Sequence, residues 1–403
     1  MWEQIRSNQR RSIFLVIGMG LLLLAIGYLL GFAFMDSPVV GLVIALAIWA
    51  VMSLVGYFQG DSILLSVSGA KKIGPSDHPR LYNIVEEMKI ASGLEYMPSI
   101  YIIDDQALNA FATGRDPKKA SVAITSGLLN KLNRDELQGV IAHEMAHIKN
   151  RDVLLMAMTS VLLGTIVILA WYGSRIMLFS GAGRSRSSSR SGGGGQAQLI
   201  IMVVAIVLAI LAPIIAQLIY FAISRKREYL ADASSALYTR YPEGLASALE
   251  KLGRSTGQLK SANKATAPMY IVNPFRKEGV SFSDLSSTHP PITERIKILR
   301  GMAGNSYINY EEAYQQVHSG RGGVIPATGL VGENVPLPSN TPISKADDPD
   351  EAQRIRETSN ALWNANQYQT IGCECGAKLK LPPGFKGNSI TCPRCNRKHE
   401  VKS

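Results

Sequence analysis

The chain has 403 residues, a length that suits two or three domains. Its net charge of +11, from 42 Lys and Arg against 31 Asp and Glu, suits a partner such as nucleic acid or an anionic membrane surface. Only 4 residues are cysteine, and 46% are hydrophobic, so the distribution of the apolar residues decides the class.

Two apolar segments without charged residues, 13–34 and 39–58, open the chain. Each is long enough to cross the core of a bilayer, which takes about 20 helical residues. A cleaved signal peptide would have a shorter apolar region, of about 7–15 residues, and a small-x-small cleavage site, which does not follow Phe34. We therefore expect an N-terminal transmembrane hairpin.

The first soluble part of the chain mixes helices with strands. Apolar residues at helical spacing predict an amphipathic helix over residues 79–92. Residues 100–103 and 121–124 are short, rich in β-branched side chains and bounded by turn formers, which predicts two strands. The pattern indicates an α+β fold that is mainly helical.

The segment from residue 133 to 152 carries the signals of a capped helix. Asn133 can cap its start, and Glu136, three residues on, can return a hydrogen bond to the cap. Leu132 and Leu137 stand where the two apolar residues of a hydrophobic staple would lie. A helix is therefore predicted to begin just after Asn133.

His143 and His147 lie four residues apart on this helix, so their imidazoles project from one face. Two neutral imidazoles at that spacing can share one Zn²⁺, and Glu144 can activate the attacking water as a general base. This is the H-E-x-x-H arrangement of zinc peptidases. The alternative is an amphipathic helix with surface histidines, but the chain has only 6 His, and chance would produce this pattern in about 1% of cases or fewer.

A second pair of apolar segments, 153–172 and 199–223, follows the metal helix. One such segment could be a buried core helix, but four in one chain favour an integral membrane protein with four transmembrane helices in two hairpins. Residues 180–196 between them are rich in Gly, Ser and Arg and are predicted to form a flexible connector.

Basic residues predict the orientation in the membrane, because they accumulate on the cytoplasmic side. Arginines precede the first span, and a basic cluster follows the fourth: Arg6, Arg10, Arg11, Arg225, Lys226 and Arg227. We expect a multi-pass protein of the cell (inner or plasma) membrane, in contact with membrane lipid, with its active site and C-terminus facing the cytoplasm. Arginines in the connector conflict with full crossing of the second hairpin, which leaves open a hairpin that dips in without crossing: Arg175, Arg184, Arg186 and Arg190.

A catalytic zinc needs a third protein ligand. The chain enters the membrane directly after the metal helix and leaves it at the same surface, where Glu228 and Asp232 are the first acidic residues. Glu228 is the predicted third ligand, and Asp232, one turn on, is placed to accept a hydrogen bond from a liganding histidine. The alternative is that Glu228 pairs with Arg225 or Lys226 at the surface.

The C-terminal region carries a pair of cysteine motifs, Cys373-x-Cys375 and Cys392-x-x-Cys395. Four thiolates at this spacing are typical of a zinc ribbon, a module too short to fold without its metal. The first pair is tighter than the usual C-x-x-C. Basic side chains around the cysteines would suit an acidic partner, and a protein partner of the ribbon is one possibility.

These signals predict six regions: an N-terminal hairpin (1–60), a first protease part (61–152), a second hairpin (153–223), a second protease part (224–302), a linker with a short helix (303–370) and a zinc ribbon (371–403).

At its metal-binding residues the chain resembles the HtpX-like branch of the membrane-bound gluzincins, which also contain the CAAX prenyl proteases. Four stretches carry the resemblance: HEMAHIKNRD at 143–152, REYLADASSA at 227–236, NAFATG at 109–114 and STHPPITERI at 287–296. The resemblance covers about residues 1–302, and typical HtpX proteins lack the cysteine module.

The resemblance implies roles that spacing alone does not give. Asn109, with Ala110 and Phe111, would bind the substrate backbone beside the active site. His289 would stabilise the tetrahedral intermediate, and Arg295 would support it. An extended substrate could add as a strand beside residues 121–124.

Five residues could have ordinary structural roles instead. Asn109 and Thr113 could be ordinary turn residues, and His289 could simply cap the helix that Pro290 and Pro291 begin. His78 and His318 are predicted to be surface residues.

The predicted function is that of a zinc metalloendopeptidase with one catalytic zinc and one structural zinc. Its substrates would be membrane or misfolded proteins at the cytoplasmic membrane face, in protein quality control, as the resemblance implies. No specific nucleic acid is expected. Two alternatives remain: a CAAX-type prenyl protease, and a non-catalytic membrane adaptor that recruits partners through its ribbon.

Overall fold

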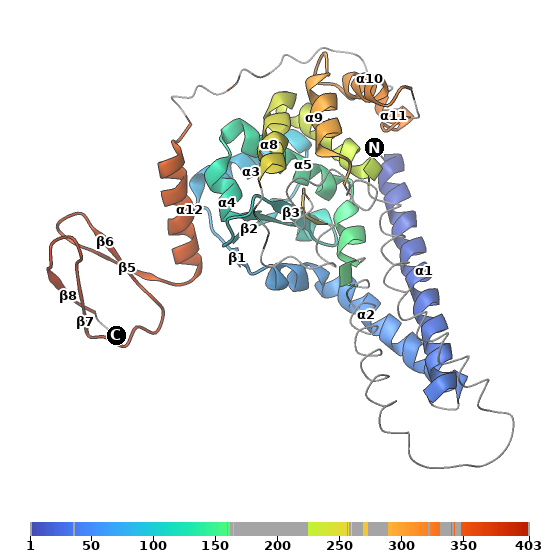
Figure 1. Cartoon of the computed structure of the whole chain (residues 1–403), viewed down its shortest axis with the longest axis horizontal. Helices are drawn as coiled ribbons and strands as arrows, with labels where there is room; N and C mark the ends of the chain where they lie inside the picture. The colour runs from blue at the N-terminus through green and yellow to red at the C-terminus, as the bar shows by residue number, and fades with distance from the viewer. Residues whose placement is uncertain are drawn as a thin grey trace.

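The structure is a computed structural model (Figure 1). It describes residues 2–34, 37–158, 160–161, 164, 225–255, 257, 259, 269–272, 289–320, 323–330, 340, 342 and 348–401. The predicted span at 199–223, the connector at 180–196 and most of the predicted span at 153–172 lie outside the described residues.

Two long antiparallel helices, α1 (Trp2–Phe34) and α2 (Pro38–Val67), form the N-terminal hairpin. Glycines allow the close approach: a Cβ on Gly41 would meet the carbonyl oxygen of Gly27 at 2.0 Å. The outer faces stay apolar, with Phe14 72% exposed and Val39 67% exposed.

Among the described residues, one helix is long and apolar enough to cross a membrane, α2; α1 holds a shorter apolar stretch, Val16–Phe32. The four predicted spans therefore remain a prediction.

A four-stranded sheet follows the hairpin: β1 (Ala70–Lys72), β2 (Ser99–Ile103), β3 (Ala110–Thr113) and β4 (Ser121–Thr125). The strand order is β1-β2-β4-β3, with β2 and β4 parallel and the other pairs antiparallel. The predicted strands are confirmed, but the prediction that a substrate adds beside residues 121–124 is wrong. β4 already pairs on both sides, so β3 forms the edge of the sheet.

Helices cover the sheet and build its larger apolar core, and a second, smaller cluster lies around Phe111 and Ala123. They are α3 (Pro79–Ser92), α4 (Ser126–Lys131), α5 (Arg134–Lys149), a helix at 225–239, α8 (Pro242–Arg254) and α9 (Ile292–Arg300). A short 3₁₀ turn, Pro117–Lys119, joins β3 to β4. Side chains from both layers are fully buried in this core: Leu81, Ile84, Ile100, Ile124, Leu128, Val140 and Leu249.

The helix predicted over residues 79–92 is confirmed, but the prediction that His78 lies at the surface is wrong. His78 is 1% exposed because its ring caps α3, where Nδ1 accepts a hydrogen bond from the N–H of Leu81 at 3.2 Å. His318 is also partly covered, since its ring stacks on Tyr314 with the ring centroids 4.2 Å apart.

Residues 303–370 are more than the predicted linker. They contain α10 (Tyr307–Val317), α11 (Ala327–Leu330) and α12 (Glu351–Ala365). Tyr310 of α10 and Ala361 of α12 are both 0% exposed and belong to the core that surrounds α5. The short helix predicted within this linker is α12, and it packs on α4 rather than standing free.

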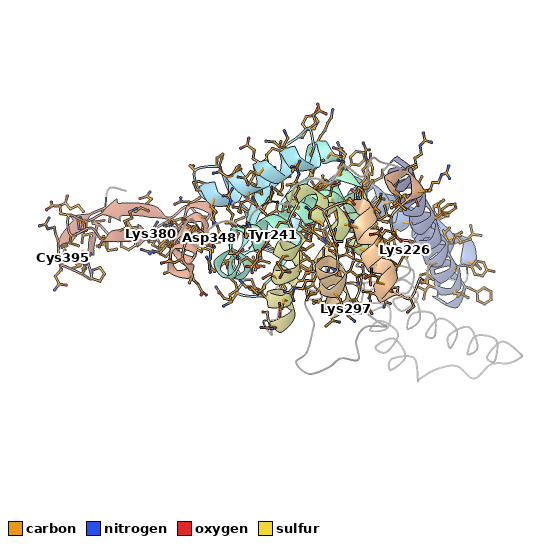
Figure 2. All side chains as sticks on the ribbon, turned by 90° about the horizontal axis from the view of Figure 1, so that it is seen from above. Lys226, Tyr241, Lys297, Asp348, Lys380 and Cys395 are labelled. Carbon is orange, nitrogen blue, oxygen red and sulfur yellow. The ribbon has the colours of Figure 1, made fainter. Side chains whose placement is uncertain are left out.

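The C-terminal module is a pair of two-stranded hairpins beyond α12: β5 (Gln369–Gly372) with β6 (Lys378–Leu381), and β7 (Ser389–Thr391) with β8 (Lys398–Glu400). In Figure 2, Lys380 and Cys395 mark this module at one end of the molecule, and Lys226 lies toward the end that holds α1.

Candidate metal centre

The metal helix α5 begins with the capping box expected from its sequence. The side chain of Asn133 accepts a hydrogen bond from the N–H of Glu136, and the carboxylate of Glu136 accepts one from the N–H of Asn133, both at 2.9 Å. Glu136 also binds Ser247 and Lys251 of α8, each at 2.7 Å. The start of α5 is therefore fixed to a neighbouring helix as well as capped.

Three predicted ligands meet on one side of α5. The Nε2 atoms of His143 and His147 lie 3.2 Å apart. The carboxylate of Glu228 lies 3.5 Å from His143 Nε2 and 3.6 Å from His147 Nε2. Glu228 is 3% exposed and faces the rings, so it does not form the surface ion pair that was the alternative. The helix at 225–239 brings it to this position.

These distances fit a tetrahedral zinc ion. Bonds of about 2.0–2.2 Å from zinc to nitrogen and oxygen place neighbouring ligand atoms about 3.3–3.5 Å apart. Oε2 of Glu228 is buried without a hydrogen-bond partner in the described part of the chain. Facing ring nitrogens and an unsatisfied carboxylate are costly in a dry interior, and a cation relieves that cost.

Asp232 orients His143 as its spacing predicted. Its carboxylate lies 2.9 Å from His143 Nδ1, which leaves Nε2 to face the other ligands. Arg295 holds the same carboxylate with two hydrogen bonds, at 2.6 and 2.8 Å. Burial alone would raise the pKa of Asp232, but the Arg295 guanidinium lowers it, so Asp232 stays charged.

The charges around Glu228 also keep it ionised. Burial would raise its pKa, but the nearby rings of His289, His143 and His147 hold the pKa well below its usual value. Burial also opposes protonation of His143, yet the carboxylates of Asp232 and Glu228 raise the pKa of its ring to about 9.

His289 faces the metal centre, as the resemblance implied. Its Nε2 lies 3.7 Å from Glu228, and it is 5% exposed. The capping alternative is wrong, because Pro291 occupies the N-cap of α9. Burial lowers the pKa of His289 to about 4, so the ring is neutral near pH 7 and can donate a hydrogen bond without carrying charge.

Arg295 differs from its implied role. The resemblance places it in support of His289, whereas its hydrogen bonds go to Asp232 and to the backbone carbonyl of Ile271. It therefore fixes the carboxylate that orients His143, and its Nη1 also lies 3.8 Å from Oε2 of the ligand Glu228.

Glu144 lies between the metal ligands and the edge of the sheet. It is 2% exposed, and the backbone N–H of Ala112 in β3 donates a hydrogen bond to its carboxylate. Burial raises the pKa of Glu144 above its usual value. A general base gains strength from a raised pKa as long as the working pH stays above that value.

The three predicted substrate-binding residues contact a segment of the chain itself, Met269–Val272. The Asn109 amide donates to the carbonyl of Val272 at 3.0 Å. The carbonyl of Ala110 accepts from the N–H of Ile271 at 3.0 Å, and Phe111 packs edge-on against Tyr270 with the ring centroids 5.3 Å apart. Their role toward substrate stays a prediction, and the contact with residues 269–272 was not foreseen. Asn109 is buried rather than an ordinary turn residue.

Sequence reasoning missed Asp152, whose carboxylate lies 3.1 Å from His147 Nδ1. The residue lies five positions beyond the histidine, a spacing that brings side chains together in neither a helix nor a strand. An acidic residue directly after a metal helix was the available signal.

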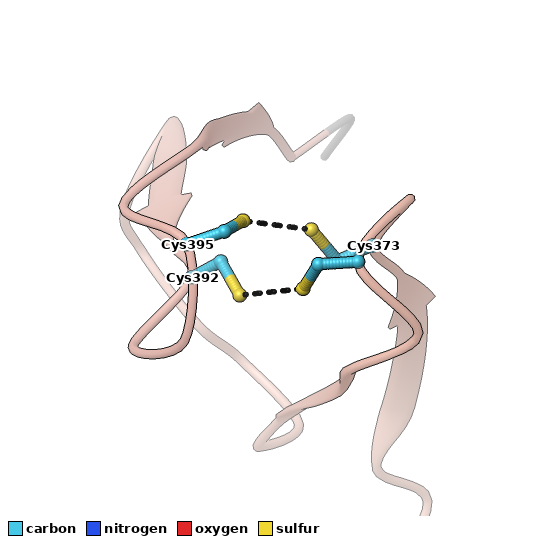
Figure 3. Close-up of side chains that lie close together, drawn as sticks. Cys373, Cys392 and Cys395 are labelled. Carbon is cyan, nitrogen blue, oxygen red and sulfur yellow. Dashed lines mark hydrogen bonds between the residues drawn. The ribbon is translucent and has the colours of Figure 1, made fainter.

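The four cysteines form a second candidate metal site (Figure 3). The sulfur of Cys373 lies 3.4 Å from that of Cys395, and the sulfur of Cys375 lies 3.7 Å from that of Cys392. Disulfide sulfurs would lie about 2.05 Å apart, whereas four thiolates on one zinc lie about 3.8 Å apart. A backbone N–H of Arg394 lowers the pKa of Cys392, which favours its thiolate, whereas burial and the neighbouring cysteine side chains raise the pKa of Cys373.

Comparison with known proteins places this geometry in a family. The family model described as Peptidase family M48 matches residues 75–303. A protein named Protease HtpX homolog from Dictyoglomus turgidum is 44% identical over 301 residues, which cover 75% of this chain and 94% of that protein. Its namesake from Streptococcus uberis is 41% identical over 302 residues, covering 75% of this chain and all of that protein.

Among solved structures, the crystal structure of S. mikatae Ste24p aligns with a TM-score of 0.39 and 20% sequence identity, covering 74% of this chain and 67% of that chain. The cysteine module lies beyond the residues that the family model matches.

Proposed function

Because the chain belongs to peptidase family M48, we propose that this membrane zinc metalloprotease is an endopeptidase that cleaves membrane or misfolded polypeptides at the cytoplasmic membrane face. One observation carries the proposal. Two imidazoles and a carboxylate converge within bonding reach of one ion, and Glu144 lies directly beside them.

His143, His147 and Glu228 would hold the ion. Zinc, when bound, supplies a Lewis acid that polarises the scissile carbonyl and makes water a better nucleophile. These three residues leave a fourth position open, as a catalytic site requires.

Glu144 moves the proton in this reaction. Its carboxylate takes a proton from the attacking water and delivers it to the nitrogen of the departing amine. His289, neutral and facing the ligands, donates a hydrogen bond to the oxygen on which negative charge develops. The N–H of Ala112 keeps Glu144 aimed toward the edge of the sheet.

The proposal that the substrates are cleaved at the membrane is based on the N-terminal hairpin. Both helices expose many large apolar side chains, including Phe14 and Val39. A soluble protein rarely leaves so large an apolar surface in contact with water. The C-terminal end of α2 reaches the site region, because Ser68 there lies 3.2 Å from the hydroxyl of Tyr270. Arg6 and Arg10, before the apolar part of α1, favour a cytoplasmic site, where unfolded membrane proteins would be removed in quality control.

We propose that the four cysteines hold a second, structural zinc. Their module has only three buried residues in its own apolar cluster, Cys373, Leu379 and Cys392, so the metal would supply most of its stability.

The decisive experiment compares the purified full chain with Glu144→Gln on an unfolded protein such as casein, with and without a zinc chelator. We expect the variant to keep its zinc and to lose about 10²–10⁴-fold in rate. Glu86→Gln makes the same change at an exposed position of α3 and serves as the matched control.

Cleavage that persisted in Glu144→Gln after contaminating proteases had been removed would reject the mechanism. A prenylated CAAX peptide in a parallel assay separates the two enzyme functions. Selective cleavage of that peptide would favour the CAAX-type protease, and zinc binding without cleavage of either substrate would favour the adaptor.

A further inference from the structure

We propose that Asp152 is a positioning residue of the metal centre, which fixes the ring of His147 so that Nε2 faces the metal. The inference rests on the proposed function, since it concerns the same site. It gives His147 a carboxylate partner equivalent to the one that Asp232 gives His143.

The contact is direct and dry. Asp152 Oδ2 lies 3.1 Å from His147 Nδ1, and the two side chains are 1% and 5% exposed. A carboxylate oxygen accepts the hydrogen bond, so this contact is made with the hydrogen on Nδ1. The lone pair of the ring then resides on Nε2, which lies 3.6 Å from the Glu228 carboxylate on the metal side.

The two histidines are oriented from different parts of the chain. Asp232 comes from the helix at 225–239, which also supplies Glu228. Asp152 comes from the residues just after α5, where the next helix begins. Loss of either carboxylate would leave one ring free to rotate or to carry its hydrogen on the metal-facing nitrogen.

A strained turn brings Asp152 to this position. In a continuous helix, a residue five positions on would point about 140° away from His147. Instead, α5 ends with the N–H of Asn150 bonded to Ala146, and Arg151 adopts a left-handed conformation with φ 57°. This conformation is unfavourable for a residue with a side chain, by about 1 kcal/mol, so the surrounding structure must hold it. The turn folds the chain back and aims Asp152 at the ring.

The test measures metal affinity in the full chain, purified in detergent. Co²⁺ binding is followed by near-ultraviolet and visible absorption, because four thiolates give near-ultraviolet charge-transfer bands that the histidine site lacks, while the histidine site is read from its weaker visible d–d bands. Zn²⁺ affinity at the histidine site then follows by competition. We expect Asp152→Ala to bind Zn²⁺ about 10–100-fold more weakly there. Asp152→Asn, which keeps an acceptor oxygen, should fall between that variant and the parent.

Asp104→Asn changes an exposed aspartate and should leave the affinity unchanged. Arg151→Gly tolerates the left-handed turn and should also bind normally, whereas Arg151→Val, which disfavours the turn, should weaken binding although Asp152 is intact. This second pair tests the proposal even if Asp152→Ala fails to fold.

Unchanged Zn²⁺ affinity in a folded Asp152→Ala protein, or equal affinity in Arg151→Gly and Arg151→Val, would overturn the proposal. The outcome is independent of peptide cleavage. A parent chain that binds zinc and cleaves nothing would reject the proposed function, while the affinity ratios would still decide the role of Asp152.

Discussion

Arg295 carries a full charge in the protein interior, where an unpaired charge is among the costliest features a fold can hold. It is 0% exposed, and its pKa is raised because the Asp232 carboxylate outweighs the effect of burial. The two side chains therefore stabilise each other's ionised form and fix the carboxylate that orients His143.

Removing one member of this pair should strongly destabilise the folded protein. We expect Arg295→Leu to lower the free energy of unfolding by about 3–5 kcal/mol, because Asp232 would stay buried without its partner. Arg300→Leu is the matched control, since Arg300 makes its ion pairs with Glu243 and Glu250 at the surface and should cost about 1 kcal/mol or less. Thermal midpoints in detergent provide the comparison, and equal midpoints for the two variants would contradict it.

His78 should make stability depend on pH. Burial lowers the pKa of its ring from 6.5 to about 4, so the unfolded chain takes up a proton more readily than the folded one. The stabilisation is complete above pH 6.5 and is lost as the pH falls toward 4, by about 3 kcal/mol at most.

The variant His78→Asn keeps an N-cap for α3 but cannot titrate. Its thermal midpoint should therefore fall less than that of the parent between pH 7 and pH 5. Parallel decreases in the two proteins would show that other groups cause the acid sensitivity.

The residues of the metal centre that share one helix face were predictable, because helical geometry alone brings His143 and His147 together. Glu228 and Asp232 required the further inference that the chain returns to the same surface. For Asp152 the sequence offered an acidic residue directly after the metal helix, but its contact with His147 depends on a left-handed backbone at Arg151 that no residue preference signals. His78 was wrongly predicted to lie at the surface, because the sequence around it looks like a turn. In the structure its ring caps α3 and is buried.

At the scale of elements, α5 and α8 pack with almost no gap. A Cβ on Gly139 of α5 would meet the backbone nitrogen of Leu245 in α8 at 2.6 Å. Backbone atoms cannot move aside as a side chain does. The helix that holds the metal ligands is therefore positioned by direct backbone contact.

We expect Gly139→Ala to lower stability by about 1–3 kcal/mol, despite the better helix propensity of alanine. Gly18→Ala in α1 is the control, because a Cβ there meets nothing within 4 Å. Thermal midpoints measure both effects, and a more stable Gly139→Ala protein would show that the helices can separate without cost.

The periodicity of apolar residues predicted individual helices and strands well, but it did not predict which elements lie side by side. The helix predicted over residues 79–92 matches α3 to the residue, since Pro79 marks its start and Gly93, in a left-handed conformation, ends it. Strand order depends on pairing between distant segments, so nothing local in β4 indicates that β3 and β2 flank it. The helix α10 escaped prediction because its buried residues, Tyr310 and Ala313, lie in a segment with weak apolar periodicity.

At the scale of the whole molecule, the part of the chain beyond the family match is docked onto the protease. Asp348 accepts a hydrogen bond from the backbone N–H of Arg134, the first residue of α5, at 3.1 Å. It also pairs with Arg80 and Arg354. The extension thus supports the same helix end that Asn133 caps.

Truncation should separate the two parts of this extension. A chain that ends after Ala303 loses α12 and the Asp348 carboxylate, and we expect a clearly lower thermal midpoint. A chain that ends after Gln367 loses only the cysteine module and should keep the midpoint of the parent. Equal midpoints in both truncations would show that the docked helices contribute nothing to the stability of the protease.

The overall organisation was predictable where composition changes abruptly, as at the apolar hairpin and the cysteine module. The docking of residues 303–370 was not, because polar contacts such as that between Asp348 and Arg134 leave no pattern in the sequence. The clustering of the four cysteines could be predicted from their spacing, because the ligands of one metal ion lie together wherever the module is placed.

The metal centre is assembled from pieces that leave the ribosome at different times. The two histidines and Asp152 are synthesised first; Glu228 and Asp232 follow only after the long intervening stretch, and His289 later still. A partly synthesised chain therefore has two of the three proposed ligands, lacks Glu228, and would bind the ion weakly. The proposed catalytic site is therefore complete only when synthesis has passed the second half of the protease, residues 224–302.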